Sequence, residues 1–591
     1  MRVLAPALLA AAAVPFAPAA AQPQNQPGAP RGQTRDDIRR PVQPAPRGSP
    51  ARLEIESDME RSPCALDDPR FESIRFTPTN VVFQDLRGLA PDALRTAYEP
   101  YLGREQPVSV LCEIRDRAAA ILREAGYVAA VEIPEQRIED GDIRFQVLMA
   151  RLVAVRVRGD AGRNERTIAR YLRHLEGREV FNRFEAERYL LLAGDLPGHA
   201  VRLALRSAGQ ARGEVVGDVT VVRTPGLVDF SVQNNGGREL GRWGALLRGQ
   251  LYGLTGLGDR TTLAFFSTSD FEEQRTLQAG HDFRIGGEGF ALSGQLTYAW
   301  ASPDVGDPAI DIDARTLVAT VEASYPFIRR LSHSVRGAVG LDLIDQDIDF
   351  NGLALNRDRL RVAYARLDAD AQGVGDARRY TLAEPRWRVG GTVELRHGVG
   401  LLGASRGCGP ALANCTGGAL QPTRLEGDPT AFVIRADLQS EFRPLPNLTF
   451  ALAAAGQHAG RPLFAFEEYS AGNYTIGRGY EPGTLLGDSG VGLQAELRVG
   501  RAFPRTPESW AFQAYAFYDR AWVWNEDSFA AAPTRDRLSS AGGGVRAAWG
   551  NRARIDVTLA VPLERAGLQT ERPDPRLLIS LTTRLWPWSL R

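Results

Sequence analysis

Residues 475–500 read TIGRGYEPGTLLGDSGVGLQAELRVG. A lone arginine, Arg478, lies between two glycines and is followed by Tyr480. After a second glycine-rich segment at 487–490, aliphatic and polar side chains alternate from 491 to 499. Alternation with a period of two and charges on one face is typical of a strand at a boundary between lipid and water. The stretch therefore predicts a long loop, with a glycine-flanked cation, beside an amphipathic strand.

The same alternation dominates the chain from about residue 227 onward, for example at 290–300 and 432–439. In a soluble sandwich the apolar face would form the core, whereas in a membrane barrel it would face lipid around a polar lumen. Three observations favour the barrel. The region extends to the end of the chain, its polar face carries many Arg, Asp and Glu residues, and the last strand, 576–586, ends in an aromatic residue. Its length fits about 16 antiparallel strands, an even number.

The region before the barrel follows a different pattern, because helices of period 3.6 alternate there with short strands. The element order β-α-α-β-β runs through 70–151 and is repeated through 152–224. Two adjacent segments with one element order indicate a tandem repeat. We therefore expect two α+β domains at 70–151 and 152–224, followed by a transmembrane barrel at 225–591.

The N-terminal residues predict export. Residues 1–21 contain Arg2, an apolar run and three alanines before Gln22, which is typical of a secretory signal peptide. Residues 22–51 are rich in Pro, Gln and Arg and nearly lack aliphatic residues, so we expect a flexible leader. No later run reaches about 18 apolar residues, and no membrane helix is expected.

Composition excludes several classes of function. The chain contains no lysine, so its 71 basic residues are all arginine, balanced by 71 Asp and Glu residues. A Walker phosphate loop, a kinase and a Schiff-base enzyme each need a lysine. Zero net charge without a basic stripe argues against nucleic-acid binding. We therefore expect no nucleotide, no nucleic acid, no cofactor and no bound metal.

The segment GDSG at 487–490 imitates the nucleophile motif of serine proteases. None of the six histidines lies in a recognisable histidine motif, which a catalytic triad would need. We interpret Gly487, Asp488 and Gly490 as a tight turn after the loop, and we expect no enzymatic activity.

Four cysteines suit an oxidising compartment and allow three pairings. We favour Cys408 with Cys415, which would close a short loop, and Cys64 with Cys112, because each cysteine then bonds its nearest neighbour in the chain. No histidine or third cysteine lies near Cys64 or Cys112, so a disulfide is a better interpretation than a metal site.

Several stretches resemble the two-partner secretion outer-membrane translocators (TpsB, the ShlB/FhaC/HecB-type haemolysin secretion/activation proteins), within the POTRA-plus-barrel outer-membrane superfamily. Residues 126–147 are similar to the first POTRA domain of the family, and 234–241 to its first barrel strand and turn. GRGYEPGTLLGDSG at 477–490 resembles the signature loop, and FYDRAW at 517–522 resembles a Phe-x-Asp motif two strands later. The resemblance covers nearly the whole mature chain.

In this family the signature loop folds back into the lumen, and its arginine meets the aspartate of the later strand. Carried over, the resemblance implies that Arg478 pairs with Asp519, in the motif that begins at Phe517. An arginine partly removed from water favours a bidentate carboxylate, and flanking glycines allow close approach to the wall. The loop residues are Gly477, Arg478, Gly479 and Tyr480.

The sequence also departs from the family pattern. Asn234 stands where the first barrel motif leads us to expect an acid. Relatives often carry an N-terminal helix that plugs the pore, but here the leader offers only RGQTRDDIRR at 31–40. We therefore expect no ordered plug.

The resemblance implies a protein of the outer membrane, surrounded by lipid, with its N-terminal domains in the periplasm. The POTRA domains would capture an unfolded TpsA-like exoprotein of the haemolysin or haemagglutinin type, through exposed sheet edges. The barrel would then pass this client to the cell surface. The alternative is an assembly or insertion factor for outer-membrane proteins. The presence of two POTRA domains, rather than a longer string of them, argues against this alternative.

Overall fold

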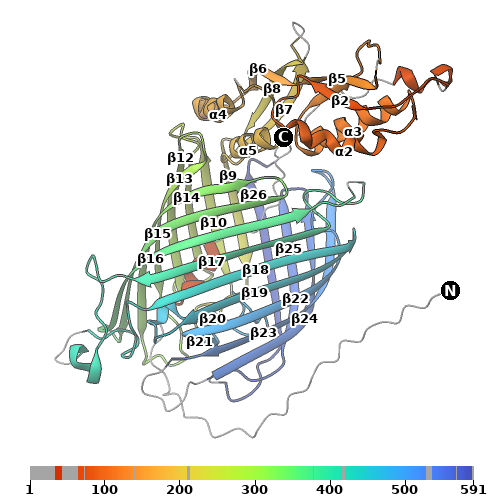
Figure 1. The fold of residues 1–591 in the computed structure, drawn as a ribbon. Helices are drawn as coiled ribbons and strands as arrows, with labels where there is room; N and C mark the ends of the chain where they lie inside the picture. The colour runs from red at the N-terminus through yellow and green to blue at the C-terminus, as the bar shows by residue number, and fades with distance from the viewer. Residues whose placement is uncertain are drawn as a thin grey trace, which may run out of the picture.

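The computed structural model describes residues 33–42, 64–71, 73–138, 140–176, 178–208, 213–376, 378–415, 420–526, 535–567 and 569–588. The predicted signal peptide and most of the predicted leader lie outside these residues. Two α+β modules lie at one end of a closed barrel (Figure 1). Among the helices in the described ranges, none has the length and apolar character needed to cross a membrane.

The first module is a three-stranded sheet covered by helices. Strand β2 (Asn80–Gln84) pairs in parallel with β5 (Asp142–Met149), which pairs antiparallel with β4 (Ala129–Glu132). Helix α3 (Val110–Glu124) buries one face against this sheet, because its apolar residues recur at helical spacing. The remaining elements are β1 (Arg75–Phe76), η3 (Pro91–Leu94), α2 (Arg95–Tyr98), η4 (Glu99–Tyr101) and β3 (Gln106–Pro107), with η1 (Ala65–Asp67) and η2 (Pro69–Phe71) before them.

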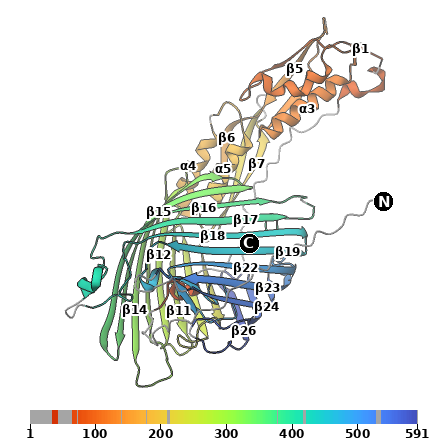
Figure 2. The ribbon, with the colours of Figure 1, turned by 60° about the horizontal axis from the view of Figure 1, so that its bottom comes forward.

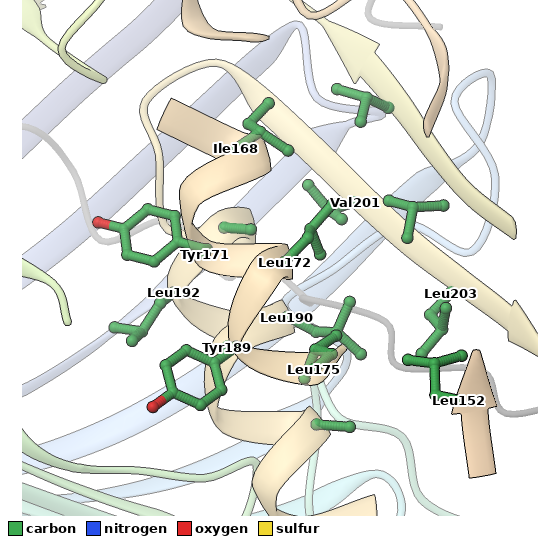
Figure 3. Packing of buried hydrophobic residues seen from close by; sticks show 14 of the residues in the cluster. Leu152, Ile168, Tyr171, Leu172, Leu175, Tyr189, Leu190, Leu192, Val201 and Leu203 are labelled. Atoms are coloured by element: carbon green, nitrogen blue, oxygen red, sulfur yellow. The ribbon is translucent and has the colours of Figure 1, made fainter. Parts of the chain in front are cut away.

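The second module repeats the β-α-α-β-β order. Its sheet has the order β6-β8-β7, with β6 parallel to β8 and β7 antiparallel to it. Figure 3 shows helices α4 and α5 packing leucines and tyrosines against this sheet, which gives the module its own core. The elements are β6 (Arg151–Gly159), η5 (Gly162–Asn164), α4 (Glu165–Leu172), η6 (Arg173–Leu175), α5 (Arg183–Gly194), β7 (His199–Ser207) and β8 (Glu214–Arg223).

Both favoured disulfides are present. Cys64 bonds Cys112 of α3 across 48 residues of sequence, and Cys408 bonds Cys415 across 7. A loop-closure estimate gives about 4 kcal/mol of stabilisation for the first bridge and about 2.5 kcal/mol for the second. The longer bridge therefore fastens the start of the first module to its main helix.

Sixteen antiparallel strands close into the barrel, as the alternation predicted. Closure pairs the first strand with the last and so avoids a long unpaired sheet edge, which lipid would not tolerate. The strands, in barrel order, are β9 (Gly226–Gln233), β10 (Gly244–Tyr252), β11 (Arg260–Thr268), β12 (Gln274–Ile285), β13 (Phe290–Ala301), β14 (Ile312–Arg329), β15 (His333–Phe350), β16 (Leu353–Gly373), β17 (Trp387–Gly398), β18 (Phe432–Leu445), β19 (Leu448–Ala459), β22 (Ser489–Gly500), β23 (Trp510–Trp524), β24 (Arg535–Trp549), β25 (Ala553–Pro562) and β26 (Arg576–Trp586). A further short helix, η7 (Pro410–Cys415), lies in the connection between β17 and β18.

The two faces of the wall differ in chemistry. Aliphatic and aromatic side chains are exposed on the outside, among them Val321, Val339, Phe450, Phe512 and Leu559. The alternate positions point into the lumen and include buried charged groups, such as Asp342, Arg396 and Asp519. An apolar exterior around a charged interior matches a barrel in lipid and contradicts a sandwich with an apolar core.

The second module is docked onto the turns at one end of the barrel. Asp195 accepts two hydrogen bonds from the guanidinium of Arg329, from Nε at 2.6 Å and Nη2 at 2.7 Å. The Tyr189 hydroxyl donates to Glu288 at 2.9 Å, and the side chain of Asn164 accepts from the backbone N–H of Gly258 at 3.0 Å. The first module lies farther from the barrel (Figure 2).

The prediction of a flexible leader without an ordered plug is wrong for residues 33–42. Helix α1 (Arg35–Val42) lies inside the barrel, where it is drawn in red in Figure 1. Its residue Ile38 is fully buried in a cluster with Ala299, Val318, Ile344, Leu360, Val362, Phe464 and Phe466. An eight-residue helix is marginal in water by itself, so these tertiary contacts stabilise a helix that local composition does not reveal.

Candidate functional site

The candidate site is the connection between β19 and β22, residues 460–488, which we call the lumen loop. It contains the short helix η8 (Ala465–Glu467) and a hairpin of β20 (Tyr469–Ala471) with β21 (Leu485–Gly487). The loop packs inside the barrel against apolar residues of β23 and β24. The buried cluster comprises Tyr469, Ala471, Ile476, Tyr480, Leu485, Ala521, Val523, Leu538 and Ala566.

Arg478 lies against Asp519 of β23. The fully buried carboxylate of Asp519 accepts from Arg478 Nε at 3.0 Å, from Nη2 at 2.7 Å and from the backbone N–H at 3.0 Å. The guanidinium also lies over the ring of Phe517, with Cζ 3.5 Å from the ring centroid. Burial lowers the pKa of Arg478, but the hydrogen bonds and charges of Asp519 and Glu496 outweigh this and raise it, so the side chain stays charged.

A second acid, Glu496 of β22, contacts the same arginine and was not predicted as a partner. Its carboxylate accepts from Nη1 of Arg478, from Arg498 at 2.6 Å and from Arg546 at 3.1 Å. Glu496 is 7% exposed and therefore sits within a lumen network instead of in water. Its place on the polar face of 491–499 was the only sequence signal for this contact.

The residues next to Arg478 fix the tip of the lumen loop to the wall. Gly477 has φ +125°, and a Cβ there would lie 2.6 Å from a Leu538 methyl group. The buried Tyr480 hydroxyl lies within hydrogen-bond distance of the backbone oxygens of Ser539, at 2.9 Å, and Glu564, at 2.7 Å, and shares its one proton between them. Glycine is required at 477 both for backbone conformation and for close approach.

The predicted turn at Gly487, Asp488 and Gly490 is a bend between two strands, because β21 ends at Gly487 and β22 begins at Ser489. Asp488 is fully buried there. Its carboxylate accepts from the guanidinium of Arg424, from the backbone N–H of Leu463 at 2.7 Å and from that of Glu526 at 2.8 Å. The sequence predicted Asp488 only as part of a turn, but its carboxylate holds together three of the connections between barrel strands.

Helix α1 shares a buried charge cluster with the lumen loop. Arg396 of β17 is 2% exposed and donates to Glu467 of the loop at 3.0 Å and to Asp342 of β15 at 2.9 Å. Arg39 of α1 lies 3.4 Å from the same Asp342. Gln346 of β15 also donates to the backbone oxygen of Gln33, at 3.0 Å. The helix and the loop therefore share one set of wall residues.

Docking of α1 should weaken as pH rises. Burial raises the pKa of Asp37 from 3.8 to about 6, although hydrogen bonds from Thr34 lower it. A carboxyl whose pKa is higher when docked takes up a proton on docking, so docking is strongest below pH 3.8 and weakens until about pH 6. We expect a loss of about 2 kcal/mol between pH 4.5 and 7.

Undocking of α1 would open the lumen of the barrel. In planar-bilayer recordings, the fraction of time that the barrel spends in its open, conducting state should therefore be larger at pH 7 than at pH 4.5. The control is Asp37→Asn, which keeps an acceptor for Thr34 but cannot ionise. The open fraction of this variant should change with pH only by the amount that the other titratable groups of the lumen cause. An equal pH response in both proteins would contradict the assignment to Asp37.

Two α+β modules followed by a 16-strand barrel with a charged loop in its lumen define an outer-membrane translocator with periplasmic domains. The chain belongs to the haemolysin secretion/activation protein family ShlB/FhaC/HecB, whose model matches residues 219–547, more than half of the chain. Residues 76–149 match the POTRA domain of ShlB type. The protein is therefore a two-partner secretion translocator of the outer membrane, with its POTRA domains in the periplasm.

Solved structures support the fold. The chain is similar to CdiB from Escherichia coli, with a TM-score of 0.70 and 16% identity over 90% of this chain and 94% of that one. It is also similar to CdiB from Acinetobacter baumannii, with a TM-score of 0.60 and 16% identity over 87% and 90% of the two chains. Comparison with curated protein sequences finds no significant match.

Proposed function

We propose that this translocator secretes a TpsA-like exoprotein of the haemolysin or haemagglutinin type. Residues 70–151 and 152–224 form the two POTRA domains and 225–591 the barrel, after a signal peptide at 1–21. The client arrives unfolded and adds as a strand to exposed edges of the POTRA sheets. Docking of the second POTRA domain on the periplasmic turns supports direct transfer to the lumen.

The lumen loop partly fills the channel and is held in place by the contact of Arg478 with Asp519. We call this contact the lock. The observation that carries this proposal is the contact of a partly buried arginine with two buried wall acids, Asp519 and Glu496. Breaking such a pair from one side leaves an uncompensated buried charge. The contact therefore holds the loop in one position with Gly477, Gly479 and Tyr480.

The transport step involves no covalent chemistry by this chain. His458 Nδ1 lies 3.4 Å from Ser489 Oγ, which is the arrangement that a nucleophilic serine would need. Ser489 is fully buried, however, and its hydroxyl is engaged with the backbone of Ala459. A substrate carbonyl cannot reach it, which supports a structural role. Transport is driven by folding of the client outside the cell.

The outer wall is in contact with outer-membrane lipid. Its exposed apolar side chains would otherwise face water over the whole circumference of the barrel. The charged lumen instead offers a wet path for a polypeptide.

The test is secretion of an exoprotein whose gene lies next to the gene of this protein. We expect the exoprotein to reach the medium when both are expressed together, and to remain in the periplasm when residues 70–224 are deleted. Secretion without the POTRA domains would contradict their role in capture. Assembly of unrelated barrels, without secretion of the exoprotein, would instead support the assembly-factor alternative.

A further inference from the structure

The seam where the first barrel strand meets the last is completed by side chains. Strand β9 ends at Gln233, which pairs with Ser580, whereas β26 continues to Arg576. Strand β9 is therefore too short to pair with the backbone groups of residues 576–579. An open sheet edge at this point would leave hydrogen-bonding groups unpaired next to lipid headgroups.

Asn234 supplies the missing partner. Its backbone N–H donates to the oxygen of Ile579 at 3.1 Å. Its side-chain oxygen accepts from the N–H of Ile579 at 2.6 Å, and its side-chain nitrogen donates to the oxygen of Leu577 at 2.8 Å. The amide thus imitates one residue of a strand, with one donor and one acceptor at the spacing of alternate residues.

This geometry requires an amide. An ionised carboxylate accepts hydrogen bonds but cannot donate one, so an aspartate would lose the bond to Leu577 and set a negative oxygen against its carbonyl. The amide at Asn234, where we expected an acid, therefore has a physical reason in this chain.

Arg576 completes the seam and joins it to the lumen loop. Its guanidinium donates to the backbone oxygen of Gly236 at 2.9 Å, just beyond Asn234, and to that of Tyr480 at 2.7 Å. A second contact, from Asn473 Nδ2 to the oxygen of Asn235 at 2.8 Å, also joins the loop to this end of the seam. The arginine-bearing loop and the seam therefore lie in one connected structure.

We propose that Asn234 and Arg576 are positioning residues that keep the barrel seam closed while the client passes through the lumen. This inference rests on the proposed secretion function. A closed seam confines the client to the lumen, whereas insertion of other barrels into the membrane would need a lateral opening.

The first test is amide hydrogen exchange of the purified full-length protein in detergent or nanodiscs. Asn234→Ala removes both side-chain bonds and should speed exchange in residues 576–581 roughly tenfold, with β25 unchanged. Asn234→Asp is isosteric and should give a smaller increase in the same residues. It carries the test if the alanine variant does not reach the membrane.

The matched control is the neighbouring Asn235→Ala, because within the described part of the chain the side chain of Asn235 bonds only the side chain of Gln233. Its exchange in residues 576–581 should equal that of the wild type. Unchanged exchange in both Asn234 variants would overturn the role of Asn234, whatever the function of the protein.

The second test locks the seam with a disulfide between Ser231→Cys and Thr582→Cys, which face each other across it. We expect the oxidised double variant to secrete the client at the wild-type level. Loss of secretion that a reductant restores, with the wild type unaffected by reductant, would show that the seam must open. If the wild type secretes no client, the proposed function fails, and the exchange result still decides whether Asn234 holds the seam.

Discussion

Replacing Arg478 with alanine is expected to abolish or sharply reduce secretion while the barrel remains in the outer membrane. The change leaves Asp519 without its guanidinium partner, although this carboxylate is fully buried. Removal of one member of a buried ion pair costs about 3–5 kcal/mol. That cost falls on the seating of the lumen loop, because the wall strands keep their hydrogen-bonded ladders.

Secretion into the medium and heat-modifiable migration of the barrel measure the two expected results separately. The matched control is Arg388→Ala, since Arg388 also faces the lumen but contacts Gln372 and the backbone of Leu382. Secretion by this variant should stay near the wild-type level. Normal secretion by Arg478→Ala would count against the lock.

The partners of Arg478 are expected to differ in importance. Asp519 accepts from the backbone and from two guanidinium nitrogens, whereas Glu496 accepts from one and is also neutralised by Arg498 and Arg546. Asp519→Ala should therefore impair secretion more than Glu496→Gln. A charge swap at 478 and 519 would set an acid beside Glu496, so a double-mutant cycle with alanine is the cleaner measure of coupling. Additive losses in that cycle would contradict direct contact.

Replacing Ile38 with aspartate is expected to release helix α1 and open the lumen. Ile38 is fully buried between the wall and Phe464 and Phe466. Burial of an isoleucine side chain contributes about 1.5–3 kcal/mol, and an unpaired carboxylate in the same place adds a further penalty. An eight-residue helix has little other stabilisation to offset this loss.

Channel conductance in planar bilayers should rise strongly for Ile38→Asp, and cells should become sensitive to large hydrophilic antibiotics. The conservative variant Ile38→Leu should keep the wild-type conductance, because it retains the apolar volume. Equal conductance of the aspartate variant and the wild type would mean that α1 does not occlude the lumen.

Sequence reasoning predicted the fold well because the main signals were local or periodic. Alternation over the barrel region identifies which residues share a face, and the structure has 16 strands with the polar positions inward. Alternation does not give the register between strands. The contact of Glu496 with Arg478 depends on that register, so the sequence showed its face but not its partner.

Helix α1 was missed for a different reason. The leader lacks the apolar content that would mark a stable element, and Ile38 near the centre of the helix supplies its buried contact with the barrel. The apolar partners of Ile38 come from residues more than 250 positions later in the chain. A local pattern cannot report contacts that the closed barrel creates.

Asp488 has a consequence for the design of surface-displayed variants. On the extracellular side, its buried carboxylate accepts hydrogen bonds from Arg424, Leu463 and Glu526, which lie in three different connections between strands. Foreign sequence placed between Thr423 and Asp428 would therefore disturb all three connections together. An epitope placed inside the loop that Cys408 and Cys415 close would lie outside these contacts, with its ends held by the disulfide.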